Sequence, residues 1–218
     1  MRPHQRWSPE ERRTLNRLTT PFRIQLYLDT LRYNITDRTH SPRAALQHRE
    51  AHCFDGALLA AAALELHGEP PLLIDLRSNG FDDDDHVLAV FRRHGCWGAI
   101  GKSNYTGCRY RDPVFRSLRE LAMSYFPIYH NLRGQKTLRD YSVPLDLRRV
   151  HDLDWRWSNE DLTPLGKRLE AKRHYPLISR RTERELVPVD DQTFEAETIR
   201  LDRRGAFKVR GGRLRVTL

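Results

Sequence analysis

The stretch Ala51-His52-Cys53-Phe54-Asp55-Gly56-Ala57-Leu58-Leu59 decides the fold, because it places a thiol at the start of an apolar helix. The residues from Cys53 to Leu66 are small and apolar nearly all round, which predicts a helix in the centre of the core. A cysteine at a helix N-terminus lies beside unpaired backbone N–H groups and the positive end of the helix dipole, which both favour a thiolate. Cys53 is therefore a candidate nucleophile, and its alternative role is that of a small buried hydrophobe.

The hydrophobic pattern after this helix changes to that of short strands. Apolar runs at 71–76, 86–91 and 96–100 predict three strands, and His94-Gly95 predicts a tight turn between the last two. His86 begins the first strand of that hairpin. An imidazole delivered there can act as the acid and base for a neighbouring thiol.

These motifs, in this order, resemble the transglutaminase-like superfamily over roughly residues 15 to 112. The resemblance rests on Cys53 with Ala57 four residues on, on the helix end Gly68-Glu69-Pro70, and on Asp85-His86-Val87 followed by Gly95 and Trp97. It implies an α+β fold of the papain/transglutaminase-like kind, with a helical lobe whose nucleophile helix packs on an antiparallel β-sheet. It also implies thiol-dependent acyl transfer through a Cys53 thioester: hydrolysis of a peptide or amide, as by a cysteine protease, or transfer to an amine.

The third catalytic residue is not settled by the pattern. The family has Asp about four residues after the tryptophan, where this chain has Gly101. A two-residue turn at His94-Gly95 pairs positions that sum to about 189, so His86 faces Ser103, and a bulge would substitute Asn104. We expect Asn104 as the orienting group, then Ser103, then Asp112. We also expect the acidic run at 82–85 to raise the imidazole pKa and keep the ring protonated.

The residues around this site predict how substrate binds. His52 is expected to tune the thiol or line the groove, and Lys102 and Tyr105 belong to a polar loop that would select a carbonyl substrate carrying a negative or polar group. A zinc site from His48 and His52, with His40 nearby, is conceivable. Because the HExxH order is absent and no second ligand pair follows, we expect no metal and no cofactor.

Composition fits one domain with an extension. The 218 residues are 39% hydrophobic, and 38 Lys+Arg against 29 Asp+Glu give a net charge of +9. We expect the transglutaminase-like domain at 1–150 and a C-terminal extension at 151–218, whose alternating segment 207–216 predicts a basic hairpin. An alternative function follows: a catalytically inactive fold that binds nucleic acid or an acidic partner through residues 200–218.

The cellular setting is predicted from what the chain lacks. Three cysteines do not make a disulfide framework, and no apolar stretch suits a signal peptide or a bilayer span. We therefore expect a cytoplasmic protein with free thiols and no membrane contact.

Overall fold

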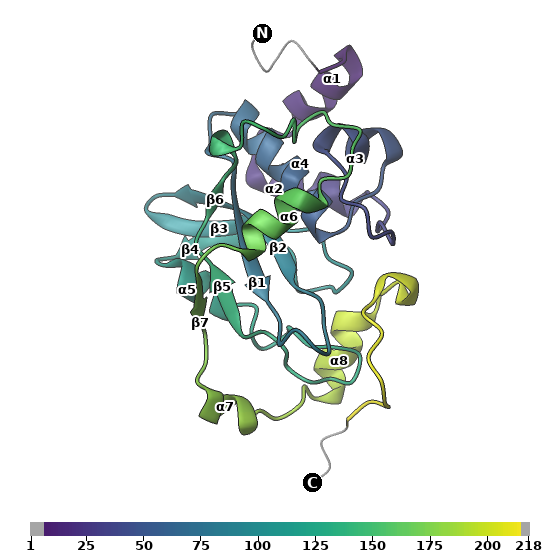
Figure 1. The fold of residues 1–218 in the computed structure, drawn as a ribbon, viewed down its shortest axis with the longest axis vertical. Coiled ribbons are helices and arrows are strands. Elements are labelled where there is room, and N and C mark those ends of the chain that lie inside the picture. The colour runs from purple at the N-terminus through teal and green to yellow at the C-terminus, as the bar shows by residue number, and fades with distance from the viewer. Residues whose placement is uncertain (1–6, 215–218) are drawn as a thin grey trace.

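Four helices come first in the chain, and each begins at a residue whose side chain caps it. The computed structural model describes residues 7–214 (Figure 1). The caps of the first three helices are Ser8, Thr20 and Ser41, each followed by proline in the first turn, which is favoured there because proline lacks an N–H. The four helices are α1 (Pro9–Arg17), α2 (Pro21–Asp29), α3 (Pro42–His48) and α4 (Cys53–Leu66).

One antiparallel sheet follows, so the α+β fold with an antiparallel sheet is confirmed and is compatible with a papain-like fold. Its strand order is β4-β3-β2-β1-β5-β7, and β6 also pairs with β1. The strands are β1 (Leu72–Arg77), β2 (His86–Arg93), β3 (Cys96–Ile100), β4 (Arg111–Phe115), β5 (Asp140–Ser142), β6 (Leu145–Asp146) and β7 (His174–Pro176).

The hairpin of β2 and β3 has the predicted register. Its partners run from Arg93↔Cys96 to Ala89↔Ile100, so paired positions sum to 189. His94 and Gly95 both have positive φ, 51° and 80°, as a two-residue type I′ turn requires.

The sheet separates two apolar clusters because alternate side chains of its central strands point to opposite faces. Helix α4 packs on the face that carries Leu73, Val87 and Phe91. The opposite face carries Leu76 and Leu88 and is covered by α5 (Leu118–Met123) and the aromatic segment after it. This explains why β2 is apolar at consecutive positions.

Two helix predictions downstream need correction. The segment 113–126, predicted as one helix, contains the end of edge strand β4 and then α5, because Ser117 caps a new helix start. The polar helix predicted at 158–172 is the shorter α6 (Thr163–Glu170). The remaining helices are the 3₁₀ turn η2 (Leu147–Arg149), α7 (Arg180–Arg184), α8 (Asp191–Thr198) and the 3₁₀ turn η3 (Arg203–Gly205).

The basic tail was predicted to pair with itself. In Figure 1, α7, α8 and the C-terminal segment lie at the end of the molecule opposite α1. Residues 207–214 form no strand; Gly211 has φ +99°, and the Leu214 N–H donates to the Arg133 carbonyl, so the segment pairs with a neighbouring loop instead. Residues 215 and 216 of the predicted hairpin lie outside the described residues.

None of the helices between residues 7 and 214 has the length and apolar character needed to span a bilayer.

Candidate active site

Helix α4 places the Cys53 sulfur against the first residues of β2, which pair with β1 but not with β3. The thiol donates to the Asp85 carbonyl at 3.9 Å, and the Val87 N–H donates to the sulfur. Asp85 and Val87 flank His86, so the sulfur lies alongside the backbone at the histidine, just beyond the end of the β2–β3 ladder. The structure thus places the Cys53 sulfur against the backbone on either side of His86, while the hydrogen bond given for the His86 ring goes to the Cys108 carbonyl.

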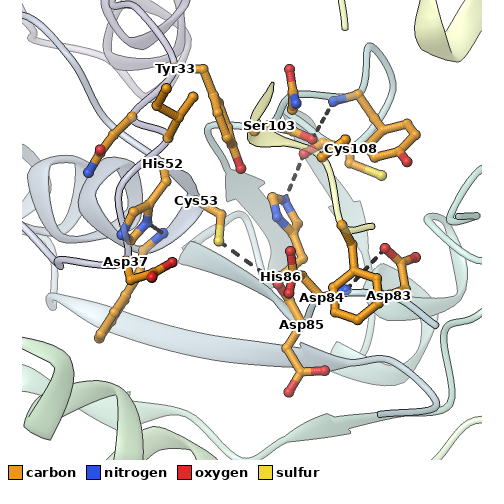
Figure 2. Close-up of a pocket in the computed structure, with 18 of the residues that line it drawn as sticks. Tyr33, Asp37, His52, Cys53, Asp83, Asp84, Asp85, His86, Ser103 and Cys108 are labelled. Atoms are coloured by element: carbon orange, nitrogen blue, oxygen red, sulfur yellow. Dashed lines mark hydrogen bonds between the residues drawn. The ribbon is translucent and has the colours of Figure 1, made fainter. Parts of the chain in front are cut away.

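Both side chains line one cavity of about 550 Å³ (Figure 2). His86 is buried, with 6% of its surface exposed, while Cys53 is half-buried at the cavity wall. A cavity of this volume, lined by both side chains, is within the range of small-molecule and peptide sites.

The resting pair is uncharged, contrary to the expected thiolate and imidazolium. Burial raises the pKa of the Cys53 thiol to about 12, and the Val87 N–H offsets only part of that rise. Burial lowers the pKa of His86 to about 4. The acidic run does not reverse this, because burial is the largest influence on the His86 ring; desolvation also raises the pKa of Asp83 to about 7 and of Asp85 to about 6, so Asp83 is only partly ionised at neutral pH.

A backbone carbonyl orients the His86 ring. Its Nε2 lies 2.8 Å from the Cys108 carbonyl oxygen, and a carbonyl can only accept, so Nε2 carries the proton and Nδ1 is left as the base. The approach is close at Gly101, where an added Cβ would lie 3.3 Å from Nε2 and 2.6 Å from Leu88. Leu88 and the His86 ring thus leave no room for a side chain at Gly101, the position where the transglutaminase-like superfamily has Asp.

The side chains expected to orient His86 have other partners. The Asn104 amide donates to the Asp202 carbonyl at 2.8 Å and accepts from the Asp202 N–H at 2.9 Å, so its place as first choice was wrong. Ser103 does line the cavity, but its Oγ accepts the Tyr105 N–H at 2.9 Å. Asp112 lies in edge strand β4, beyond β3 from the histidine.

His52 has a structural task at the start of α4. Its ring Nδ1 accepts the backbone N–H groups of Phe54 and Asp55, at 3.1 and 3.5 Å. The backbone N–H of His52 donates to the Asp55 carboxylate. The ring also lines the cavity. His52 therefore fixes the backbone on which Cys53 stands and forms part of the groove wall.

Lys102 does not reach the cavity, so its predicted role in substrate binding was wrong. Its ammonium group is buried and donates to the carbonyls of Leu28 and Leu31, at 3.0 and 2.6 Å, where it caps the end of α2. Burial lowers its pKa to about 8. Tyr105, by contrast, lines the cavity and packs edge-on against His130.

Asp55 holds together the segments around the nucleophile and was not singled out in the sequence. Its fully buried carboxylate accepts three hydrogen bonds: from the Asn34 side-chain amide at 2.9 Å, from the His40 backbone N–H at 2.6 Å and from the His52 backbone N–H at 3.0 Å. Burying a carboxylate is costly unless such donors surround it. The motif Ser/Thr/Asp/Asn at a helix cap, with an acid three residues on, is the signal that points to it, here with histidine as the cap.

Two further groups at the cavity were also missed. The Tyr33 hydroxyl points toward Cys53 (Figure 2), and burial, with the nearby thiol, raises the pKa of this phenol well above its usual value. The C-terminal segment from Arg204 to Phe207 lines the same cavity, held there by the Asn104–Asp202 pair. Neither could be found from local patterns, because both reach the site through long-range packing.

The mouth of the cavity is acidic although the chain is basic. Asp37, Asp84 and Glu170 line it and are exposed. The pKa of Asp84 is raised by partial burial and, to a smaller degree, by the negative charge of Asp37. Arg204 is the one Arg or Lys side chain that lines the cavity within the described residues, and it already pairs with Asp202 at 2.7 Å.

Comparison with known proteins gives distant support for a peptidase. No protein-family model matches the sequence. The chain is 31% identical over 96 residues to Tubulinyl-Tyr carboxypeptidase 1 of Mus musculus. The similarity covers 41% of this chain and 25% of the relative, so the chain spans about a quarter of the relative's length. This similarity supports the class of hydrolase or peptidase and gives no support for transglutamination.

Proposed function

We propose that this protein is a thiol-dependent peptidase that acts through an acyl-enzyme on Cys53. The observation that carries the proposal is the sulfur at the start of α4 beside the backbone of His86, with both side chains on one open cavity. The similarity to a carboxypeptidase agrees with it.

The chemistry follows from the neutral resting pair. As the sulfur attacks the substrate carbonyl carbon, Nδ1 of His86 takes the thiol proton, which joins thiol activation to bond formation. The C–N bond then breaks and the imidazolium gives its proton to the leaving amine, which leaves a thioester on Cys53. Attack by water, with His86 again as base, releases a carboxylic acid and restores the thiol. An amine in place of water would give transfer rather than hydrolysis.

The negative charge that develops on the carbonyl oxygen needs donors. The Cys53 N–H is the natural candidate at the helix start, since the next two N–H groups are directed to His52. The Tyr33 hydroxyl, on the same wall, is the second candidate. Its high pKa keeps it protonated, so it stays a donor throughout the neutral range.

The acidic mouth favours substrates with positive charge near the scissile bond. Asp37, Asp84 and Glu170 would attract a lysine or arginine side chain and repel an acidic one. Binding of a substrate's terminal carboxylate, as a carboxypeptidase requires, would fall to Arg204. We therefore propose a cationic peptide as substrate, and the carboxypeptidase mode is the second possibility.

The test is digestion of a mixed peptide library by the full chain, with products identified by mass spectrometry. Each peptide is supplied with a free and an amidated C-terminus, since only carboxypeptidase action requires the free acid. Hydrolysis that is abolished by Cys53→Ala and kept by Cys96→Ala supports the proposal. Products unchanged by Cys53→Ala, or no hydrolysis together with salt-dependent binding of nucleic acid, would overturn it and favour the binding-module alternative.

A further inference from the structure

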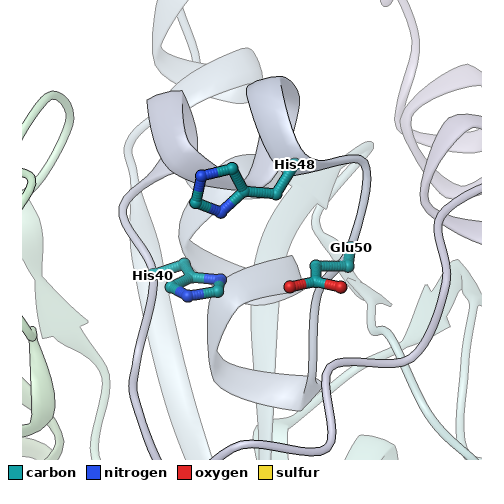
Figure 3. A group of neighbouring side chains, drawn as sticks. All are labelled: His40, His48 and Glu50. Carbon is teal, nitrogen blue, oxygen red and sulfur yellow. The ribbon is translucent and has the colours of Figure 1, made fainter.

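A cluster outside the cavity brings together three metal-binding side chains (Figure 3). One ring nitrogen each of His40 and His48 and a carboxylate oxygen of Glu50 lie within 4.8 Å of one another. None of the three lines the cavity around Cys53. We propose that these residues bind one zinc-class divalent ion. The ion would hold together the two ends of α3, just before the nucleophile helix.

The backbone places these groups without help from an ion. Helix α3 separates His40, just before its cap, from His48, its last residue. Arg49 then takes a left-handed conformation, φ 54°, which turns the chain so that Glu50 returns toward the helix. The two imidazole rings lie 5.2 Å apart between centroids, at 79°. A tetrahedral ion with bonds of about 2.1 Å needs donors about 3.4 Å apart, so a small closure of these side chains suffices.

The donors select the class of ion. Two imidazoles and one carboxylate suit zinc and related transition metals, whereas calcium and magnesium prefer oxygen ligands. Three protein ligands leave a fourth position for water, and His48 is exposed, so water can reach it.

The surroundings of His40 favour a ligand role. Its Nδ1 is buried and has no hydrogen-bond partner, and it lies 3.8 Å from the fully buried Asp55 carboxylate. With an ion on Nε2, the ring proton would sit on Nδ1, and a small shift of the ring would let Nδ1 donate to this carboxylate, as the second nitrogen of a metal-binding histidine usually does. Asp55 also accepts the backbone N–H groups of His40 and His52, so an ion held by His40 is linked to the start of the nucleophile helix.

One existing contact would yield to the ion. The Arg32 guanidinium lies 3.5 Å from the Glu50 carboxylate, with 76% of its side chain exposed. An exposed pair of this kind contributes little, so a divalent ion can replace it while Arg32 moves into solvent.

The experiment measures zinc binding by the full chain after treatment with a chelator, using equilibrium dialysis and elemental analysis. It is done in a Cys53→Ser background, so that the thiol of the cavity cannot contribute. We expect one zinc per chain and a higher melting temperature with zinc. His48→Ala should weaken zinc binding at least about 100-fold, while His151→Ala, an exposed histidine outside the cluster, should not.

Cobalt gives a second readout. Co²⁺ at this site should give visible absorption of four-coordinate intensity, which Glu50→Gln reduces. No zinc retained at micromolar free metal, equal binding by His48→Ala, or binding lost through His86→Gln instead would overturn the proposal. Since the site is independent of Cys53, its failure would leave the proposed peptidase untouched.

Discussion

The Nε2 atom of His86 donates to the Cys108 carbonyl oxygen at 2.8 Å, which leaves Nδ1 as the base. Replacing His86 by Gln keeps a donor but removes the base, so peptide hydrolysis should fall about 10²–10⁴-fold. Because the pKa of His86 is lowered to about 4, activity should be lost only as pH falls through about 4. The measurement is the pH profile of hydrolysis. His94→Gln, in the exposed turn, is the control and should match the parent; an acid limb near pH 6.5 would contradict the buried, neutral ring.

Alkylation of Cys53 by iodoacetamide should be slow at neutral pH. Burial raises the pKa of this thiol to about 12, so the labelling rate should climb steadily with pH and show no inflection below pH 8. Mass spectrometry of the labelled peptides gives the rate at Cys53 beside that at Cys96, which serves as the internal reference. A thiolate inflection on the acid side would show that an ion pair exists before substrate arrives.

Asp55→Asn should destabilise the protein and disorder the start of α4. The substitution gives a buried amide to a site built for three donors, so unfolding free energy should fall by about 3 kcal/mol. Chemical denaturation measures this, with Asp152→Asn, an exposed carboxylate, as the control. If both variants unfold like the parent, Asp55 does not have the structural role assigned to it.

The buried pair of His174 and Asp75 should make stability depend on pH. Their side chains approach to 3.1 Å, and this hydrogen bond raises the pKa of His174. A raised folded pKa means that the contribution is complete below the unfolded pKa of about 6.5 and is lost as pH rises through the folded pKa. His174→Gln should therefore lower the melting temperature more at pH 5.5 than at pH 9; an equal loss at both would contradict the charged pair.

The tie between Asn104 and Asp202 should hold the C-terminal segment at the cavity. Asn104→Ala removes both of its hydrogen bonds, so amide hydrogen exchange in residues 202–207 should become faster. Asn159→Ala, an exposed asparagine, is the matched control. Unchanged exchange in that segment would mean that other contacts hold it.

Local patterns predicted the parts of the molecule that local forces decide. Helix α4 has the predicted bounds, since small and apolar residues predominate from Cys53 to Leu66 and Gly68 follows its end. The β2–β3 register follows from the His94-Gly95 turn, whose positive φ values fix it. These two elements carry the predicted nucleophile and base.

The misses share a physical cause, which is tertiary packing. Lys102 looked like a surface cation, yet it caps α2 from 74 residues away. Asn104 was chosen by register, but the ladder ends at Ile100 and the chain then follows its own loop. The neutral state of Cys53 and His86 was also not predicted from the sequence. Desolvation of the two side chains outweighs the helix dipole and the acidic run, and burial depends on tertiary packing.

The most direct test of the account is covalent capture at Cys53 by a peptidyl chloromethyl ketone that carries lysine next to the reactive group. Intact-protein and peptide mass spectrometry should find one adduct per chain, on Cys53, that forms far more slowly with His86→Gln and not at all with Cys53→Ala. An adduct on Cys96 or Cys108 with Cys53 unmodified would contradict the claim that the sulfur and the imidazole form a working pair on an open cavity.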